Sequence, residues 1–300
     1  MTKHFIDFDN LSFEVLQDII NRAIILKKDH NEGVINNSLK NKTLAMIFDK
    51  SSTRTRVSFE AGMTQLGGHA LFLSNNDIQL GRGEPITDSA IVISSMVDAV
   101  MLRISSHEDI IEFSKYSNKP VINALSDLSH PCQILADLMT YQEQRGSING
   151  KKVVWIGDGN NVCQTYMQAA EIFGFELTIA SPKGYEPNQS FVESYQNNIN
   201  YCNSSMDACE VADLVVTDVW TSMGKESEQK QRESAFKGYQ VNQKMMSVAN
   251  SDALFMHCLP AHRGEEVSAD VIDGKQSVVW DEAANRLHAQ KALLLYLIEA

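Results

Sequence analysis

The sequence has no apolar run that approaches the roughly 20 residues needed to span a bilayer. It also has no repeat of fixed period and no low-complexity tract. Residues 1–10 (MTKHFIDFDN) include acidic side chains and no long apolar stretch, so we expect no signal peptide there. These absences favour a cytoplasmic protein that does not bind membranes.

Paired cysteines are missing as well. The five cysteines are an odd number, and none of them forms a Cys-x-x-Cys pair. Reduced thiols in a cytoplasmic protein are the simplest interpretation. The cysteines are Cys132, Cys163, Cys202, Cys209 and Cys258.

Basic residues are also fewer than acidic residues. The chain has 26 basic and 38 acidic residues, which gives a net charge of −12. This balance argues against broad binding to nucleic acids or acidic membranes. An anionic small molecule would therefore need a local cluster of arginines.

The remaining composition is ordinary for a soluble enzyme, with 43% hydrophobic and 21% charged residues. A chain of 300 residues exceeds what one core usually organises, so two domains are expected. After an opening amphipathic helix, which Asp9 or Ser12 would cap, strand-like and helix-like segments alternate. This alternation predicts βαβ units and parallel sheets. In the first half we expect strands over 44–48, 70–73, 99–104 and 121–124, and helices over 55–66, 87–96 and 107–115.

A second series begins at Lys152. It predicts strands over 153–156, 177–180, 214–217, 254–257 and 278–280, with a helix over 162–173. A long helix over 131–144 would bridge the halves, and a helix over 283–298 would pack back on the first half. Residues 182–205, rich in Asn, Gln and Ser, predict no clear element. The expected fold is α/β, with two doubly wound parallel-sheet domains joined by long helices.

Polar and reactive residues gather where the expected strands end. Ligands of open α/β sheets bind beyond the carboxyl ends of the strands, so these positions favour a catalytic site in a cleft between the domains. SSTRTR (51–56) lies between a strand and a helix, where backbone N–H groups, hydroxyls and arginine forks suit a phosphate. The other strand-end motifs are Arg103, SDLSHPCQ, GDGNN, TDVWTSMG, HCLPAHRG and WDEAANR.

GDGNN (157–161) invites a dinucleotide-binding interpretation. The third glycine of G-x-G-x-x-G is missing, because Val162 stands in its place. The next strand ends in Ala180 and Ser181 without an acidic residue, which also counts against a nicotinamide cofactor. Asn160 and Asn161 would instead cap the following helix, or one of them would contact a polar substrate.

Two other motifs leave alternatives open. His130 and Gln133 lie at a helix start beside Pro131, where they would bind a carbonyl or phosphate oxygen or simply cap the helix. In HCLPAHRG, Cys258 and its neighbouring histidines (257 and 262) would ligate a metal, form a Cys–His nucleophile pair or contact a substrate. An inert thiol is the remaining alternative, and the neighbouring Arg263 and histidines weaken it. No fourth metal ligand is evident nearby, which weakens the metal interpretation.

Asp218 follows the expected strand over 214–217 and precedes a loop that contains a glycine. A loop anchored by a carboxylate suits recognition of a cationic amine. An ordinary surface loop is the alternative.

Taken together, the motifs SSTRTR, HPCQ, GDGNN, DVWTSMG and HCLPAHRGEEV resemble those of the aspartate/ornithine carbamoyltransferase family, and the last three resemble its ornithine branch. The resemblance covers the chain from the opening helix to NRLHAQKA. It implies a carbamoyl-phosphate-binding domain over 1–130, a bridging helix over 131–148, an ornithine-binding domain over 149–283 and a C-terminal helix over 284–300. It also implies a homotrimer with active sites at subunit interfaces, and neither a metal nor another cofactor.

Carried over residue by residue, the resemblance assigns roles at the strand ends. It implies that the catalytic residues are Arg54, Arg103, His130, Asp218 and Cys258. It implies that carbamoyl phosphate contacts Ser52, Thr53, Arg54, Thr55, Arg103, His130, Gln133, Cys258, Leu259 and Arg286, with Gln79 reaching in from the adjacent subunit. It implies that ornithine contacts Asn161, Asp218, Ser222 and Met223.

The activity that the resemblance implies is transfer of the carbamoyl group from carbamoyl phosphate to the δ-amine of L-ornithine. The products would be L-citrulline and phosphate, formed through a tetrahedral intermediate, with a role in arginine biosynthesis. Three alternatives remain: a nicotinamide-dependent oxidoreductase, a carbamoyltransferase for another amine, and a non-catalytic relative that kept the fold.

Overall fold

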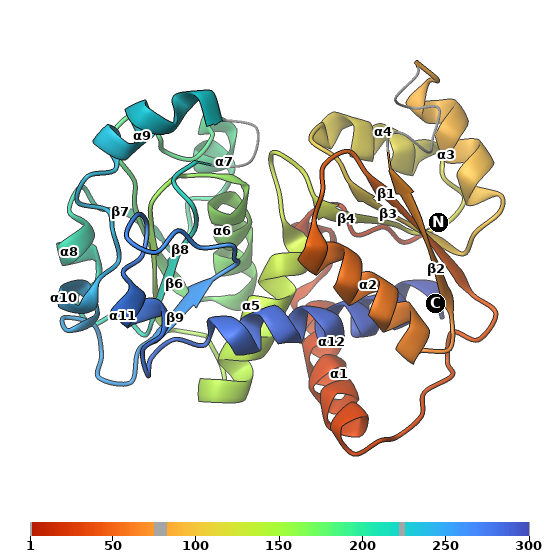
Figure 1. The fold of residues 1–300 in the computed structure, drawn as a ribbon, viewed down its shortest axis with the longest axis horizontal. Coiled ribbons are helices and arrows are strands. Elements are labelled where there is room, and N and C mark those ends of the chain that lie inside the picture. Colours follow the sequence, from red (N-terminus) through yellow and green to blue (C-terminus); the bar gives the residue numbers. More distant parts are fainter. Residues whose placement is uncertain (1, 75–82, 222–225, 300) are drawn as a thin grey trace. The chain divides into compact units, whose positions relative to one another are not determined.

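The computed structural model describes residues 2–74, 83–221 and 226–299. The chain forms two compact units, of which unit 1 contains Met1–Met139 and Ala284–Ala300 and unit 2 contains Thr140–Ala283. Each unit is an α/β body built on one parallel sheet (Figure 1). The predicted class of two parallel-sheet α/β domains is thereby confirmed. Within the described ranges, no helix combines the length and apolarity that a bilayer crossing needs.

Unit 1 contains a four-stranded sheet in the order β2-β1-β3-β4. The strands are β1 (Thr43–Phe48), β2 (His69–Ser74), β3 (Ala99–Arg103) and β4 (Val121–Leu125). Its helical elements are η1 (Phe8–Asn10), α1 (Phe13–Asn31), α2 (Thr53–Gln65), α3 (Ile86–Ser94), α4 (His107–Tyr116), the start of α5 (Pro131–Arg145) and most of α12 (Val279–Ile298). Every residue of β3 is buried, as the apolar run over residues 99–102 predicts for a central parallel strand, and the buried Arg103 ends the strand.

Unit 2 contains a five-stranded parallel sheet in the order β7-β6-β5-β8-β9. The strands are β5 (Lys152–Ile156), β6 (Glu176–Ala180), β7 (Ile199–Tyr201), β8 (Leu214–Thr217) and β9 (Leu254–His257). The helical elements are α6 (Asn161–Phe173), α7 (Gln189–Ser194), α8 (Ser205–Ala208), η3 (Glu226–Glu228), α9 (Gln229–Ala235), α10 (Gln243–Met246) and α11 (Ala269–Ile272). A buried apolar core of unit 2 includes Val154 of β5, Val215 of β8 and Phe255 of β9, which are adjacent strands.

Local sequence explains where the long helices begin and end. The Ser12 side chain accepts the Val15 N–H at 3.5 Å, so Ser12 rather than Asp9 caps α1. Asn160 caps α6 through its side-chain oxygen, which accepts the N–H groups of the two residues that follow Asn161. Gly174, with φ 68°, ends α6 in the left-handed conformation that favours glycine.

The expected strand over 278–280 is wrong. Val279 begins α12, and Ser277 contributes only an isolated parallel bridge to Phe255. A short apolar triplet fits a buried strand and a buried helix start equally well, so its pattern alone does not decide between them. Asp281 and Glu282 in the first turn are the signal for the helix, because acidic groups are favourable at a helix N-terminus.

Each sheet has one point at which the strand order reverses. In unit 1 the neighbours β1 and β3 flank this point, since β2 lies outside β1 and β4 outside β3. In unit 2 the neighbours β5 and β8 flank it in the same way. Ligands of open parallel sheets bind at such switch points beyond the carboxyl ends of the strands, so these two places are where a site is expected.

Candidate active site

In unit 1, the switch point carries the N-terminus of α2 and the end of β3. Ser52 is the N-cap residue of α2, yet its side chain makes no capping hydrogen bond. The first N–H groups of the helix are therefore not satisfied by this side chain, and they favour an anionic partner. Thr53 is exposed and Arg54 is half-buried in the same turn. This turn has the donors that a phosphate group needs.

Two arginines converge on Thr55 at the floor of this region. Arg103 Nη1 donates to Thr55 Oγ1 at 3.2 Å, and Arg286 Nη2 lies 3.5 Å from the same oxygen. Arg286 Nη1 also donates to Gln133 Oε1 at 2.5 Å. Thr55, Arg103, Gln133 and Arg286 are each at most 5% exposed. The structure thus brings together residues that are separated by more than 200 positions in the sequence.

His130 lies immediately before α5 and is buried, with 4% of its surface exposed. Burial, together with the positive charges of Arg286 and Arg103, holds the pKa of His130 well below its usual value. The imidazole is therefore neutral at physiological pH. A neutral ring beside two guanidinium groups is suited to a hydrogen bond with a polar, uncharged group such as a carbonyl.

Arg56, the second arginine of SSTRTR, has a different role from Arg54. Its guanidinium lies 3.9 Å from the centre of the Phe72 ring, and its Nε donates to Glu60 at 3.1 Å. Arg56 therefore joins α2 to β2 through the cation–π contact, while its ion pair with Glu60 lies within α2. The sequence motif alone did not separate the two arginines.

In unit 2, the switch point carries Asp218, directly after β8. Asn160 Nδ2 donates to Asp218 Oδ2 at 2.7 Å. The Val219 N–H donates to Asp218 Oδ1 at 2.8 Å, and the Cys258 thiol donates to the same oxygen at 3.1 Å. The carboxylate is 8% exposed and oriented from three directions. A fixed carboxylate of this kind is suited to bind an ammonium group.

Asn160, the N-cap residue of α6, makes the contact with Asp218 described above. The Asn161 carbonyl accepts the Thr165 hydroxyl at 2.7 Å, and its side-chain oxygen accepts the Val162 N–H at 3.1 Å. The sequence could have indicated Asn160, because an N-cap residue next to the switch point has its side chain at the helix mouth. Asn161 nevertheless remains at the start of the same helix.

A buried histidine supports the segment that carries Cys258. His257 Nδ1 accepts the Leu259 N–H at 2.9 Å, so Nε2 carries the proton and donates to Glu266 at 3.1 Å. Both side chains are fully buried. Leu259 has a φ of 55°, which is rare for a residue with a branched side chain and indicates a tightly specified turn.

Asp218, His257 and Cys258 place possible ligand atoms within 4.8 Å of one another. A metal would need a lone pair on a ring nitrogen, and both nitrogens of His257 are already engaged. These residues therefore fit a substrate-contacting role better than a metal centre. His262, Glu265 and Glu266 form a second such group, but Glu266 Oε1 accepts hydrogen bonds from His257 and from the His262 N–H.

The glycine-rich turn after β5 does not match a dinucleotide site. A Cβ atom on Gly159 would lie 2.2 Å from the nitrogen of Pro187, so this glycine permits a close approach within the chain itself. In the dinucleotide fingerprint the corresponding glycine lets the backbone approach the pyrophosphate. In this structure Gly159 allows two segments of the chain to pack closely, and this packing takes the place of contact with a pyrophosphate.

Three of the expected site residues, Gln79, Ser222 and Met223, lie outside the described residues. Sequence reasoning missed Asp137, which accepts a hydrogen bond from Gln133 Nε2 at 2.8 Å and thereby orients its amide. The available signal was the spacing of four residues between Gln133 and Asp137, which places both side chains on the same face of α5. It also missed Arg232, whose buried ion-pair partner, Asp158, is 74 residues away in the sequence.

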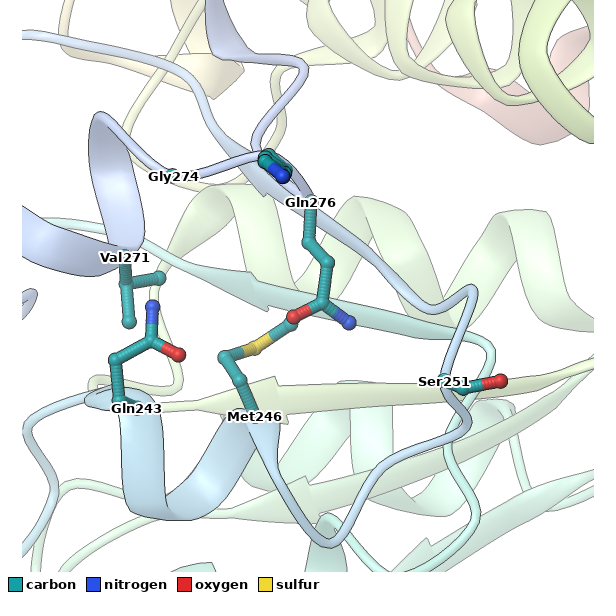
Figure 2. A pocket seen from close by; sticks show the side chains of 7 residues that line it. Gln243, Met246, Ser251, Val271, Gly274 and Gln276 are labelled. Atoms are coloured by element: carbon teal, nitrogen blue, oxygen red, sulfur yellow. The ribbon is translucent and has the colours of Figure 1, made fainter.

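A pocket of about 410 Å³ lies in unit 2, away from the residues described above (Figure 2). Its lining includes Gln243 and Met246 of α10, Val271 of α11, and Ser251, which precedes β9. The pocket therefore borders the amino end of β9, whereas Asp218 and Cys258 lie beyond the carboxyl ends of their strands.

Comparisons with known proteins agree with this arrangement. Residues 3–143 match the family model described as "Aspartate/ornithine carbamoyltransferase, carbamoyl-P binding domain", and residues 149–297 match "Aspartate/ornithine carbamoyltransferase, Asp/Orn binding domain". The chain is 66% identical to the ornithine carbamoyltransferase of Ruthia magnifica, with 99% of this chain and 100% of that protein covered.

Two solved structures extend the likeness to the fold. The ornithine carbamoyltransferase of Pyrococcus furiosus is 46% identical, with a TM-score of 0.96 and coverage of 99% of this chain and 97% of that one. The structure described as anabolic ornithine carbamoyltransferase of Campylobacter jejuni is 46% identical, with a TM-score of 0.91 and coverage of 99% of both chains. The switch-point residues, the two matching domains and these relatives together show that the chain belongs to the aspartate/ornithine carbamoyltransferase family.

Proposed function

We propose that this protein transfers the carbamoyl group from carbamoyl phosphate to the δ-amine of L-ornithine and releases L-citrulline and phosphate. The observation that carries the proposal is the convergence of Arg103 and Arg286 on Thr55, beside a neutral His130 and the N-terminus of α2. The relatives named above as ornithine carbamoyltransferases support ornithine as the acceptor. Asp218 supplies a carboxylate for a cationic amino acid.

Carbamoyl phosphate needs a site that binds a phosphate and polarises a carbonyl. We assign the phosphate to Ser52, Thr53, Arg54 and the N–H groups at the start of α2 that the Ser52 side chain does not cap. We assign the carbamoyl group to Thr55, Arg103, His130, Gln133 and Arg286, with Cys258 and Leu259 as further contacts. Gln79 of an adjacent subunit completes this proposed set.

The reaction begins when the neutral δ-amine of ornithine attacks the carbonyl carbon. The carbonyl oxygen gains negative charge, which Thr55, Arg103 and His130 stabilise as preorganised donors. The bond between the carbonyl carbon and the phosphate oxygen then breaks, and the electron pair leaves with the phosphate. Arg54 stabilises the departing anion, and the phosphate accepts the proton that the amine loses. No covalent bond to the protein forms, so Cys258 acts as a contact and not as a nucleophile.

Ornithine is assigned to unit 2. The Asp218 carboxylate and the Cys258 thiol orient the amine, and Asn161, Ser222 and Met223 are proposed as further contacts. Because the chemistry joins the two substrates, we propose that residues of unit 1 and residues of unit 2 act in the same reaction. A biosynthetic role in arginine metabolism is supported by the relative described as anabolic. We also propose a location in the cytoplasm.

A homotrimer is the proposed assembly. Exposed apolar side chains on α2, β2 and α3 support it, because contact with another copy would remove them from water. They are Val57, Leu71, Ile91 and Val92. Gln79 would reach the neighbouring site in such an assembly.

The function is tested by measuring the carbamoylated product with ornithine, putrescine, N-acetylornithine and aspartate in parallel. We expect citrulline from ornithine, because Asp218 suits a cationic amino acid, and no product from the other three acceptors. Turnover with another acceptor alone would keep the assignment of unit 1 and overturn that of Asp218. Turnover with none of them would favour a non-catalytic relative.

A further inference from the structure

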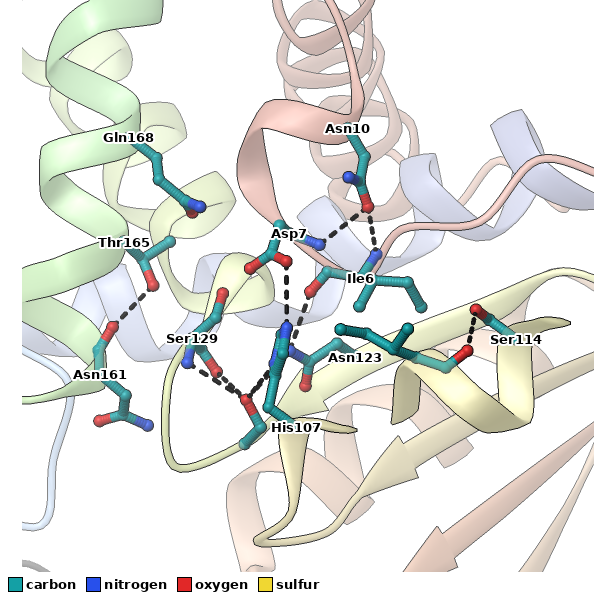
Figure 3. Close-up of polar contacts among 12 residues, drawn as sticks. Ile6, Asp7, Asn10, His107, Ser114, Asn123, Ser129, Asn161, Thr165 and Gln168 are labelled. Carbon is teal, nitrogen blue, oxygen red and sulfur yellow. Dashed lines mark hydrogen bonds and ion pairs between the residues drawn. The ribbon is translucent and has the colours of Figure 1, made fainter. Parts of the chain in front are cut away.

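His107, the first residue of α4, lies between two polar side chains from distant parts of unit 1 (Figure 3). Its Nε2 lies 3.1 Å from Asp7 Oδ2, and its Nδ1 lies 2.8 Å from Ser126 Oγ. The ring is 8% exposed and Ser126 is fully buried. Helix capping does not account for these contacts, because Ser106 already caps α4.

The Asp7 carboxylate determines which group donates in each of these hydrogen bonds. An ionised carboxylate only accepts, so His107 Nε2 carries a proton and donates it to Asp7. In the tautomer with this proton on Nε2, Nδ1 is an acceptor for the Ser126 hydroxyl, which also lies 3.4 Å from the Ser129 carbonyl. Ser126 Oγ keeps a lone pair for the Ser129 N–H, 3.2 Å away. The hydrogen bonds thus connect Asp7, through His107 and Ser126, to the main chain of Ser129.

Asp7 is itself held in place. The Asn10 side-chain oxygen accepts the Ile6 N–H at 3.0 Å and the Asp7 N–H at 2.9 Å. The Ile6 carbonyl accepts a hydrogen bond from Asn123 Nδ2 of β4 at 2.9 Å. Figure 3 shows the bonds of Asn10 to Ile6 and Asp7, and the bond between Asp7 and His107. The carboxylate therefore serves as a fixed end for the connection.

The other end of the connection is the turn that precedes His130. The Ser126 N–H donates to the Ser129 carbonyl at 2.9 Å, which closes the turn. This segment belongs to neither a helix nor a strand, so its conformation depends on bonds of this kind. Since His130 directly follows Ser129, the turn sets where its imidazole lies.

The order Asp–His–Ser resembles the triad of a serine hydrolase, but this group is not a nucleophilic site. Ser126 is 0% exposed, so no substrate reaches its hydroxyl. A nucleophilic serine also needs oxyanion donors aimed at the reacting carbonyl. Here the neighbouring Ser129 N–H is bonded to the serine oxygen itself.

We propose that His107 is a positioning residue for carbamoyl transfer, which acts through Ser126 on the turn that carries His130. This inference rests on the function proposed above. A catalytic group must be held within about 0.5 Å of its productive position. The connection to Asp7 supplies such restraint from outside the substrate site.

The test compares His107→Ala with His107→Asn. The asparagine oxygen can replace Nδ1 as the acceptor for Ser126, whereas alanine removes it. The variants are assayed for kcat per active site, with sites counted by titration with a phosphonate bisubstrate analogue. We expect His107→Ala to lower kcat per site about 100-fold, as a displacement of about 1 Å can do. We expect the KM for ornithine to stay within about twofold, and His107→Asn to restore most of the lost rate.

Further variants separate positioning from stability. Ser114→Ala, on the same helix, removes only an exposed bond to the Ile111 carbonyl and should leave kcat unchanged. Ser126→Ala should lower kcat as His107→Ala does, and the double variant should be no slower than either single one. An unchanged kcat per titrated site in His107→Ala, or additive losses in the double variant, overturns the proposal.

A readout without turnover separates this inference from the proposed function. In protein with labelled histidines, the NMR ring signals of His130 should shift in His107→Ala and stay in place in Ser114→Ala. If the wild-type protein makes no citrulline, the proposed function fails while this shift still supports the coupling. If the His130 signals are identical in all variants, the coupling is refuted whatever the activity.

Discussion

At the scale of single residues, Asp218 is the clearest example of a side chain prepared for a ligand. Its two oxygens accept hydrogen bonds from Asn160, Cys258 and the Val219 N–H. The neutral donors orient the carboxylate without neutralising its charge. An incoming ammonium group would therefore meet a full negative charge in a fixed direction.

The first residue-scale prediction concerns Asp218→Asn. The amide keeps the shape of the side chain but removes the charge, which is worth about 1.5–3 kcal/mol for a hydrogen bond to an ion. We expect the KM for ornithine to rise about 10- to 100-fold, as that energy implies. Steady-state kinetics with each substrate varied in turn measure the change. The KM for carbamoyl phosphate should be unaffected, and an equal rise in both KM values would contradict the assignment.

At the scale of elements, one buried arginine ties together three segments of unit 2. Arg232 of α9 donates to Asp158 Oδ2 and to the Trp220 carbonyl, both at 2.8 Å, and to Glu228 at 2.9 Å. Its side chain is 4% exposed. It thereby joins α9 to the segments that follow β5 and β8, which carry Asn160 and Asp218.

The element-scale prediction is that Arg232→Met destabilises unit 2. Removing one partner of a buried ion pair typically costs about 3–5 kcal/mol, because the other charge is left uncompensated. Urea unfolding followed by tryptophan fluorescence measures this loss. Arg263→Met is the matched control, because its ion pair with Asp273 at 2.9 Å is exposed and should contribute little. Similar effects of the two variants would contradict the special role of Arg232.

The alternation of strands and helices was predictable because apolar runs, turns and caps are local signals. β7 was not predicted, since Ile199–Tyr201 is a short and largely exposed strand at the edge of the sheet. The convergence of Arg103 and Arg286 on Thr55 could not be derived from spacing. It followed only from the family resemblance, because partners far apart in sequence leave no periodic pattern. No sequence motif indicated the positioning roles of Arg232 and His107.

At the scale of the whole molecule, buried histidines make stability depend on pH. Burial and the nearby charges of Lys291, His30 and Lys27 lower the pKa of His288 from 6.5 to about 4. Burial also lowers the pKa of His130. In the unfolded chain both rings take up protons near their ordinary pKa, so below it the unfolded state binds more protons than the folded state.

The whole-molecule prediction is a loss of stability between about pH 6.5 and pH 4. The contribution of His288 is fully present above pH 6.5 and disappears as the pH falls to about 4. Its shift corresponds to about 3 kcal/mol at most. Urea midpoints at pH 7.5 and pH 4.5 measure the effect. His288→Gln should narrow the difference between them, and an unchanged difference would contradict the assignment.

Unit 1 is discontinuous in sequence, which has a consequence for protein synthesis. Its core receives buried side chains of α12 from Leu293, Leu294 and Leu295, near the end of the chain. All residues of unit 2 are synthesised before these leucines. The first sheet of the nascent chain therefore keeps part of its apolar surface uncovered until α12 has been synthesised. A stop codon directly after Ala283 would leave unit 2 complete and deprive unit 1 of these leucines, so we expect the truncated chain to bind chaperones.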